Sequence, residues 1–372
     1  MRFVRTERKL VRLRREMRKD DAGRRKGKKM KKRFWMFSFL LALALVFSAC
    51  AKTNDKPATS GDGGMQSEAQ TTAKEGKTYH IGIVQLTQHP ALDSATRGFQ
   101  EELKEQFGDA VTFDVKNASG EVANVTTIVN GFVAANPDLI LANATAPLQA
   151  AASATSTIPI LGTSVTDYAT ALELKDFNGT IGTNVSGTSD LAPLDQQAEV
   201  LHEWFPNAKT VGIIYSTSEA NSVFQVQEMT KRLSAMGYTV KPFSFTDSND
   251  LPAVVTQAVA ESDVLYEPTD NVASSNAEAI ANIVLPAKCP VITGEAEPAR
   301  VFGVATVSID YEELGRATGK MAAAILRGEK NVQDMPIEYA PSAKKMVNRK
   351  NAEALGLTIP EGYEELSEPK AQ

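Results

Sequence analysis

From Tyr79 onward, short apolar runs alternate with longer stretches in which apolar residues recur every three or four positions. HIGIVQL, PDLILANAT and IPILGTSV are examples of the runs, and SATRGFQEELKEQFG is one of the amphipathic stretches between them. Runs of this length predict buried strands, and a period near 3.6 residues predicts helices. Strands that alternate with helices are typical of an α/β fold, in which helices cover both faces of a parallel sheet.

The same alternation begins again at the run KTVGIIYST, which predicts a second parallel sheet and therefore a second lobe. We assign residues 79–190 and roughly 296–330 to the first lobe, and residues 191–295 and roughly 331–372 to the second. The chain then crosses between the lobes several times, so we expect the linkers to form a hinge.

The first 50 residues have a different character. Residues 1–33 carry 17 Lys or Arg and 4 Asp or Glu, and they precede the apolar segment WMFSFLLALALVFSAC. A basic segment, an apolar segment and small residues in this order predict a secretory signal peptide, and the apolar part is shorter than the ~20 residues of a membrane span. FSAC resembles a bacterial lipobox, although Phe47 stands where Leu is usual. The resemblance implies a lipid on Cys50; the alternative is an ordinary buried cysteine.

Residues 1–29 make an unusually long basic extension, and Met30 is a second candidate start that would leave a compact leader. Residues 51–78 lack aromatic and branched aliphatic side chains, which predicts a flexible tether. If Cys50 carries a lipid, Cys289 has no cysteine left for an intrachain disulfide and is expected to pack as a small apolar side chain.

Charge and motifs exclude several functions. Beyond residue 33 the chain carries 23 basic and 41 acidic residues, and this acidic body argues against nucleic-acid binding. It contains no G-x-S-x-G, no H-E-x-x-H, no Walker loop and no G-x-G-x-x-G. Three scattered histidines and one spare cysteine are too few for a zinc cluster. We therefore expect a protein that is not an enzyme, with no catalytic residue, no metal and no cofactor.

The chain also contains the segments GIVQLTQHPALDSATRGFQEEL, VGIIYSTSEANS, YEPTDN, PVITGE, GVATVSIDYEELGRATGKMA and VNRKNAEALGLTIP. Together they span nearly all of residues 79–361 and resemble ABC-transporter substrate-binding lipoproteins of the tryptophan/tyrosine-type family. The resemblance implies a type I periplasmic-binding-protein fold, with two Rossmann-like lobes, three crossovers and ligand held between the lobes. It also implies an extracytoplasmic, lipid-anchored protein that delivers an amino acid (tryptophan, phenylalanine or tyrosine) to ABC permease subunits with a cytoplasmic ATPase.

In open parallel sheets, ligands bind beside the carboxyl ends of the strands, near helix N-termini. The segments that follow the apolar runs therefore hold the candidate ligand-binding residues, which are Gln85, Thr87, His89, Asn143, Thr145, Ser164, Thr166, Ser218, Asn221, Asp270, Asn271 and Glu295. His89 would offer a flat ring and a hydrogen-bonding edge to a ligand, and the alternative is an exposed loop histidine.

An α-amino acid presents a carboxylate and an ammonium group. Helix N-termini and the hydroxyls of Thr145, Ser164 and Thr166 suit the carboxylate, unless these hydroxyls only cap helices. Asp270 and Glu295 are the candidate partners of the ammonium, and a helix N-cap is the alternative for Asp270. Four aromatic residues either enclose the ligand side chain or belong to the core: Tyr168, Tyr215, Tyr266 and Phe302.

Three alternatives stay open at this point. The same receptor architecture would also serve a nucleoside or a branched-chain amino acid. An exported enzyme on a Rossmann-like scaffold would need a nucleophile and a base, which the motifs do not supply. A sensor that docks on a membrane kinase in place of a permease would have the same ligand-binding lobes.

Overall fold

The computed structural model describes residues 77–340 and 342–366. The predicted leader, Cys50 and all but the last two residues of the predicted tether lie outside the described residues. The described residues belong to one unit of tertiary contacts, Thr71–Gln372. Within residues 77–340 and 342–366, no helix combines the length and the apolar character that crossing a membrane requires.

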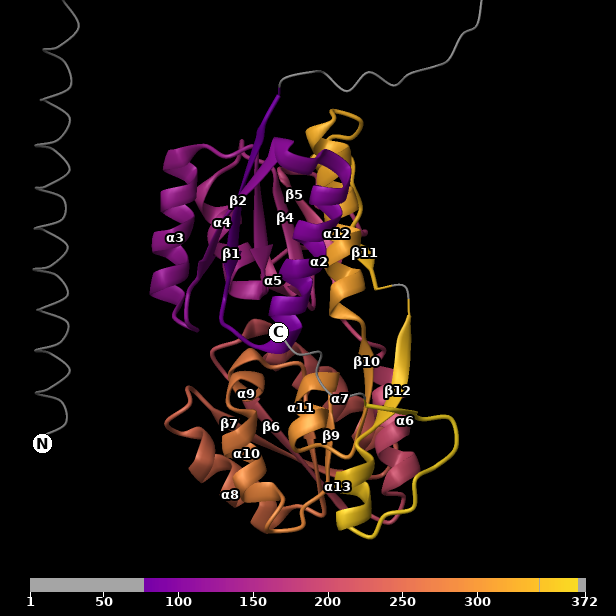
Figure 1. Ribbon diagram of the computed structural model, residues 1–372. Helices are drawn as coiled ribbons and strands as arrows, with labels where there is room; N and C mark the ends of the chain where they lie inside the picture. Colours follow the sequence, from indigo (N-terminus) through magenta and orange to yellow (C-terminus); the bar gives the residue numbers. More distant parts are fainter. Residues whose placement is uncertain (1–76, 341, 367–372) are drawn as a thin grey trace, which may run out of the picture. The chain divides into compact units, whose positions relative to one another are not determined.

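The first sheet has the strand order β11-β5-β4-β3-β1-β2, and its strands pair in parallel (Figure 1). Its strands are β1 (Tyr79–Gln85), β2 (Val111–Asn117), β3 (Leu139–Asn143), β4 (Ile160–Val165), β5 (Val185–Ser189) and β11 (Glu338–Tyr339). The helices packed with it are α2 (Pro90–Phe107), α3 (Val122–Ala135), α4 (Thr145–Ala154), α5 (Tyr168–Ala171) and α12 (Tyr311–Leu326), with short 3-10 turns at η1 (Gly108–Ala110) and η2 (Val332–Asp334). We call this assembly the first lobe.

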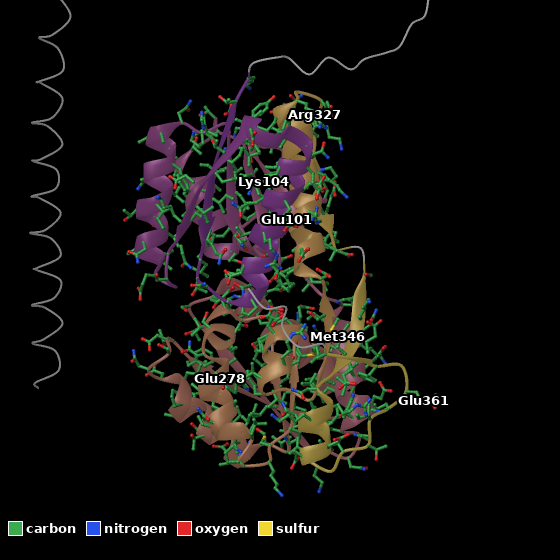
Figure 2. The ribbon with its side chains drawn as sticks, viewed as in Figure 1. Glu101, Lys104, Glu278, Arg327, Met346 and Glu361 are labelled. Carbon is green, nitrogen blue, oxygen red and sulfur yellow. The ribbon has the colours of Figure 1, made fainter. Side chains whose placement is uncertain are left out.

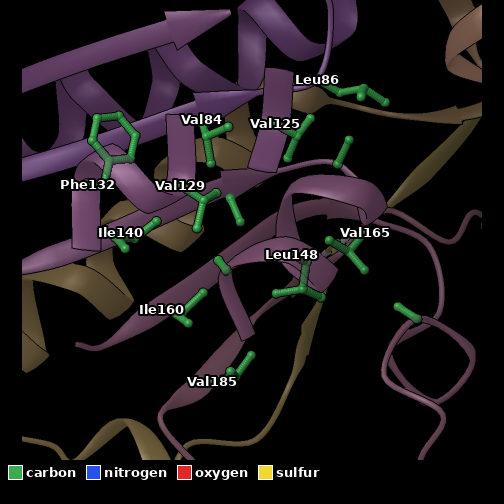
Figure 3. Packing of buried hydrophobic residues seen from close by; sticks show 14 of the residues in the cluster. Val84, Leu86, Val125, Val129, Phe132, Ile140, Leu148, Ile160, Val165 and Val185 are labelled. Carbon is green, nitrogen blue, oxygen red and sulfur yellow. The ribbon is translucent and has the colours of Figure 1, made fainter. Parts of the chain in front are cut away.

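Alternating side chains of the strands build two hydrophobic cores, one on each face of this sheet. In β3, Ile140 and Ala142 face the core under α3 and α4, whereas Leu139 and Leu141 face the core under α2 and α12. Figure 3 shows the first of these cores, in which Phe132 of α3 packs beside Ile140. The continuous apolar runs of the sequence are therefore explained by burial on both faces.

Helices α2 and α12 pack with their backbones in contact. A Cβ atom on Gly98 would lie 2.2 Å from the carbonyl oxygen of Glu312, and one on Gly315 would lie 2.0 Å from that of Ala95. At the surface, Arg316 of α12 pairs with Glu101 of α2, which is labelled in Figure 2. This close packing joins α12, which comes late in the sequence, firmly to the first lobe.

The second sheet has the strand order β13-β12-β10-β9-β8-β6-β7 (Figure 1). Its strands are β6 (Thr210–Ser216), β7 (Thr239–Phe245), β8 (Val264–Glu267), β9 (Val291–Thr293), β10 (Ala305–Ile309), β12 (Ala343–Val347) and β13 (Glu364–Glu365), and only the pairing of β10 with β12 is antiparallel among the described strands. The helices packed with it are α6 (Leu194–Trp204), α7 (Ala220–Ala235), α8 (Leu251–Glu261), α9 (Asn271–Ser275), α10 (Ala277–Val284), α11 (Ala296–Val301) and α13 (Arg349–Ala354). We call this assembly the second lobe.

Two cores also cover the faces of the second sheet. Residues of α6, α7 and α13 pack on one face, and residues of α8 and α10 pack on the other. Cys289 is buried in the latter core, as expected for a small apolar side chain. The predicted α/β fold with two mainly parallel sheets is confirmed.

The chain passes between the lobes at residues 190–193, at Asp310, and between Tyr339 and Ala343. The predicted boundaries are wrong for two segments. Residues 296–309 form α11 and β10 of the second lobe, and β11 belongs to the first sheet. The error has a physical reason: β10 looks like any buried strand in sequence, and only its hydrogen bonds to β9 assign it to a sheet.

Candidate functional site

The carboxyl ends of the strands in both lobes carry a concentration of buried polar side chains. Of the twelve residues predicted to bind ligand, Thr87 and Asn271 are half-buried, Ser218 is exposed, and the other nine are buried. Side chains from the two lobes meet here: Thr87 Oγ1 lies 3.5 Å from Ser275 Oγ of α9, and His89 contacts Asn271. Sequence reasoning therefore found side chains that the fold brings to one place.

His89 forms the clearest contact between the lobes. It is the N-cap residue of α2, and its Nε2 lies 3.1 Å from Asn271 Oδ1. Because an amide oxygen only accepts, Nε2 carries the proton and Nδ1 is left as a buried acceptor with no hydrogen-bond partner among the described residues. Burial lowers the pKa of His89, so the neutral ring is favoured. The exposed-loop alternative is excluded, because the side chain is 5% exposed.

Gln85 and Asn143 lie at the ends of β1 and β3 and are tied into the first lobe. Gln85 Nε2 donates to the Thr87 carbonyl oxygen at 2.8 Å and to Asp93 Oδ1 at 2.6 Å, and Gln85 Oε1 accepts from Thr96 at 2.7 Å. Asn143 Nδ2 donates to the carbonyl oxygen of Leu92 at 2.9 Å, but its Oδ1 has no partner within the described chain. Gln85 thus supports the strand ends, and Asn143 keeps one free acceptor.

The predicted hydroxyl groups of the first lobe have different environments. Ser164 adopts φ 53° at the end of β4, and its buried Oγ makes no hydrogen bond to any described residue. Thr166 lowers the pKa of Asp190 through a side-chain hydrogen bond, so its hydroxyl already donates to a carboxyl group. Thr145 is the first residue of α4, whose N-cap is Ala144 and therefore offers no side-chain acceptor. The first-turn N–H groups of α4 are consequently not satisfied by a cap side chain.

In the second lobe, Asp270 is the N-cap of α9. Its Oδ1 accepts from Ala273 N at 2.9 Å, and its Oδ2 accepts from Ser216 N at 2.6 Å. Asp270 therefore caps α9, as the alternative stated, and both of its carboxyl oxygens already accept a hydrogen bond. Burial raises the pKa of Asp270 even though these hydrogen bonds oppose the rise.

Glu219 lies near Asp270 and accepts a hydrogen bond from Asn271, the residue that contacts His89 of the first lobe. Its carboxyl group accepts from Val272 N at 2.9 Å and from Asn271 Nδ2 at 2.5 Å, and Asn271 in turn accepts from His89. Burial, with the neighbouring Asp270 charge as the second cause, raises the pKa of Glu219 to about 8. Asn221 also donates to Glu219, at 3.2 Å, and its Oδ1 is buried without a partner in residues 77–340 and 342–366.

Glu295 follows β9 and lies near the crossing segments. Its Oε1 accepts from Ser274, whereas its Oε2 has no hydrogen-bond partner of ordinary geometry among the described residues. Tyr311, the first residue of α12, donates to Asp190 Oδ2 at 3.0 Å and also interacts with the Glu295 carboxyl group. Burial raises the pKa of Glu295 to about 7 and that of Asp190 to about 6.

Most of the buried polar atoms that lack partners gather at these strand ends. Outside them, the described residues contribute only Trp204 Nε1 and Ser262 Oγ to this group; the site contributes His89 Nδ1, Asn143 Oδ1, Ser164 Oγ, Asp190 Oδ1, Asn221 Oδ1, Glu295 Oε2 and both carboxyl oxygens of Glu267. Folded proteins leave few buried polar groups unpaired. His89 Nδ1 and the two amide oxygens are acceptors, and the carboxyl oxygens accept when they are ionised, so the site suits a ligand that brings hydrogen-bond donors and a positive charge.

Sequence reasoning missed Asp190, Glu219, Glu267 and Tyr311. Each of the three acidic residues directly follows or ends an apolar run, or lies in a loop that was already a candidate, as in the segment STSEAN around Glu219, whereas Tyr311 begins the next helix and gave no such signal. An acidic residue at the end of a buried strand was the available signal. Ser218, by contrast, is exposed and hydrogen-bonds to Ser216 Oγ at 2.7 Å.

The aromatic candidates belong largely to the cores. Tyr168, Tyr266 and Phe302 are buried in three different hydrophobic clusters, and Tyr215 is half-buried against one of them. Tyr168 donates to the carbonyl oxygen of Thr188 at 3.0 Å. These residues therefore pack the lobes, as the alternative given for them states.

A cavity of ≈ 1010 Å³ lies elsewhere in the first lobe, where α4, the beginning of β5 and the end of α12 meet. Its lining includes Pro159 and Asn184, which precede β4 and β5 and so mark the amino ends of the strands. None of its lining residues has a buried polar atom without a partner. Because ligands of open parallel sheets bind at the carboxyl ends, we retain the strand-end site as the candidate.

Sequence comparisons place this chain among known proteins. The profile of the family described as ABC transporter substrate binding protein matches residues 80–368. A tyrosine-binding protein from Clostridioides difficile (strain R20291) is 34% identical over 299 residues, which are 80% of this chain and 86% of that protein.

Solved structures add a conformational comparison. The ABC domain from Streptococcus pneumoniae in complex with L-Trp is 34% identical, has a TM-score of 0.75, and matches over 78% of this chain and 99% of that chain. The ligand-free, open structure of a substrate-binding protein with adhesive properties from Clostridium difficile is 38% identical, has a TM-score of 0.61, and matches over 77% and 99%. This chain thus superposes better on the L-Trp complex, although the open protein is closer in sequence.

Proposed function

This chain belongs to the family of ABC transporter substrate-binding proteins, and from that premise we propose that it captures an aromatic amino acid and delivers it to an ABC importer. Tryptophan, tyrosine and phenylalanine are the proposed ligands. A substrate-binding protein of an ABC transporter works outside the cytoplasm and binds its cargo without converting it, so the protein is not an enzyme.

One observation carries the proposed ligand class: the concentration of buried, unpartnered acceptors at the strand ends. An α-ammonium group brings three N–H donors and a positive charge, and buried carboxyl groups gain most from such a partner. The first turn of α4 and Ser164 Oγ offer donors for the α-carboxylate. A nucleoside would bring amide-like donors and acceptors but no full positive charge, so it would leave the acidic groups unpaired.

We propose that binding works by hinge closure. The contacts His89–Asn271 and Thr87–Ser275 join the lobes in the conformation that superposes better on the L-Trp complex. A ligand that touches both lobes at once binds this conformation more tightly than a separated one and shifts the population toward it. The permease would then recognise the closed surface.

A lipid on Cys50 is the proposed anchor, and residues 51–78 would link it to the lobes. Replacing Cys50 with Ser should release the protein into the soluble fraction of cells, whereas Cys289→Ser should leave it in the membrane fraction. Retention of the Cys50→Ser protein in membranes would contradict the lipid anchor.

The proposed ligand class is tested by a thermal-shift screen of residues 51–372 against the twenty amino acids and common nucleosides. At a ligand concentration 100 times Kd, binding adds about 2.7 kcal/mol to the free energy of unfolding, which raises Tm by several degrees. We expect the largest rise with tryptophan, tyrosine or phenylalanine. If Tm rises most with a nucleoside or a branched-chain amino acid, the proposed ligand class is wrong and the receptor architecture still stands.

A further inference from the structure

Two carboxyl groups and one phenol meet where the chain crosses between the lobes. Asp190 directly follows β5 on the first crossing, Tyr311 directly follows the second crossing at Asp310, and Glu295 lies on the second lobe after β9. Asp190 is 3% exposed and Glu295 is 2% exposed. Tyr311 is packed by Ala91, Ala192 and Ile309, which together form a small hydrophobic cluster at the crossings.

The hydrogen bonds of this group leave one acceptor without a donor. A phenol has a single O–H, and Tyr311 donates it to Asp190 Oδ2 at 3.0 Å. The Glu295 carboxyl group, which interacts with the same phenol, therefore faces an oxygen that has no further proton to give. Its Oε2 and Asp190 Oδ1 are both buried without a hydrogen-bond partner of ordinary geometry in the described chain. Two ionised carboxylates in this position would repel each other and be poorly solvated.

We infer that Asp190, Glu295 and Tyr311 form the amine subsite of the receptor, in which the ligand's ammonium group replaces a proton held by the two carboxyl groups. The inference rests on the proposed function, since it needs a ligand with an α-amino group. The ammonium donates to Glu295 Oε2 and Asp190 Oδ1, and the displaced proton goes to solvent, so the charge of the site is unchanged. Tyr311 is a positioning residue that holds Asp190 toward Glu295.

The electrostatics of the surroundings agree with a stored proton. The pKa of Glu295 is raised to about 7 and that of Asp190 to about 6, in each case mainly by burial. The hydrogen bond from Ser274 lowers the pKa of Glu295, and the hydrogen bonds from Thr166 and Tyr311 lower that of Asp190. The other titratable groups that interact with the pair from neighbouring elements are His89, Tyr168, Glu267, Asp270 and Glu297. Of these, only His89 can become a cation, and burial lowers its pKa.

The sharpest test counts protons. Calorimetric titration of the full-length protein with L-tryptophan and L-tyrosine at pH 6.5, in two buffers of different ionisation enthalpy, should reveal release of roughly one proton per ligand. The affinity should fall as pH drops from about 8 to about 5, by up to tenfold per pH unit. The deaminated analogues, indole-3-propionate and 3-(4-hydroxyphenyl)propionate, should bind more weakly and release no proton. Equal proton release with and without the amine would overturn the inference.

Variants locate the proton. Asp190→Asn and Glu295→Gln keep the side-chain shape and remove one charge each, and either should weaken L-tryptophan or L-tyrosine binding by about 30-fold or more, with little effect on the deaminated analogues. Glu297→Gln removes a neighbouring acidic charge that is paired with Arg300, and should change affinity by less than about threefold. If Asp190→Asn and Glu295→Gln both leave the ratio of affinities for the amino acid and its deaminated analogue unchanged, the amine subsite is contradicted.

Two further measurements keep the test decisive. If Asp190→Asn or Glu295→Gln does not fold, Tyr311→Phe keeps the ring and removes the hydroxyl that lowers the pKa of Asp190, so the pH midpoint of binding should rise; an unmoved midpoint would oppose the assignment. If neither amino acid binds the unmodified protein, the proposed function fails. If they bind without proton release, only the amine subsite fails.

Discussion

The two lobes bring chemically different side chains to the same site. The buried polar residues that the first lobe places at its strand ends are amides, hydroxyls and an imidazole: Gln85, Asn143, Thr145, Ser164, Thr166 and His89. The second lobe places carboxyl groups there: Glu219, Glu267, Asp270 and Glu295. Asp190 lies between them on a crossing segment.

This difference indicates how a zwitterion would be oriented. The acidic second lobe and the crossing segment suit the ammonium end, whereas the α4 N-terminus and the neutral donors of the first lobe suit the carboxylate. A ligand with both groups then needs both lobes, which is the condition for coupling its binding to closure. The acidic side carries a cost: burial, and after it the neighbouring carboxyl groups, raises the pKa of Glu267 well above its usual value.

The largest expected effect concerns Asp270, and it tests whether this carboxyl group is needed for ligand binding. Asp270→Ala leaves the N–H groups of Ala273 and Ser216 without their acceptor, which should lower the free energy of unfolding by about 1–3 kcal/mol. Amino-acid binding, measured by calorimetry, should be abolished because α9 loses its position. Asp250→Ala is the matched control, since Asp250 precedes α8 without a side-chain cap bond. Unchanged affinity in Asp270→Ala would remove Asp270 from the site.

The second prediction concerns pH and the acidic lobe. The folded-state pKa of Glu219 is about 8 against a usual value of 4.5, so its stabilising contribution is complete below about pH 4.5 and is lost as pH rises toward 8. Denaturant unfolding of the ligand-free protein should show a free energy of unfolding that falls as pH rises through this window, with up to about 1.4 kcal/mol per pH unit of the slope coming from Glu219. Glu219→Gln should flatten the slope, and Glu278→Gln, an exposed change on α10, should not. Equal slopes in all three proteins would exclude Glu219 as the source.

The third prediction sharpens the role of the contact between lobes. His89→Ala removes the ring that donates to Asn271, which should weaken ligand binding by about tenfold and increase the radius of gyration of the ligand-free protein in X-ray scattering. His80→Ala removes an exposed histidine at the start of β1 and serves as the control. A hydrolytic activity that disappeared with His89 would overturn the receptor assignment.

The smallest effect is expected on the neutral side. Ser164→Ala removes a buried hydroxyl that has no partner within the described chain, so the free energy of unfolding should stay equal or rise slightly while affinity falls about fivefold. Ser218→Ala, an exposed change in the second lobe, should alter neither quantity measurably. An equal loss of affinity in both variants would show that the buried Ser164 contributes no more to ligand binding than the exposed Ser218.

Sequence patterns predicted most of the residues of the candidate site, because the ends of apolar runs in an α/β fold are the carboxyl ends of strands. His89, Asn143, Ser164, Asn221 and Glu295 were found in this way, and the structure gives each of them a buried atom without a partner. The same patterns could not rank the acidic residues. Glu219 and Asp190 look like loop residues in sequence, and only burial beside other carboxyl groups changes their protonation.

The sequence by itself determined the α/β class and the two sheets, since local apolar periodicity and turn positions encode these directly, and its motifs carried the resemblance to the family. Tertiary structure alone decided that residues 296–309 belong to the second lobe and that α12 packs against α2. It also decided that Tyr311 donates to Asp190 although 121 positions separate them, and that Glu295 interacts with the same phenol. The physical reason is that strand pairing and burial are non-local: they depend on which surfaces exclude water together, and no short segment contains that information.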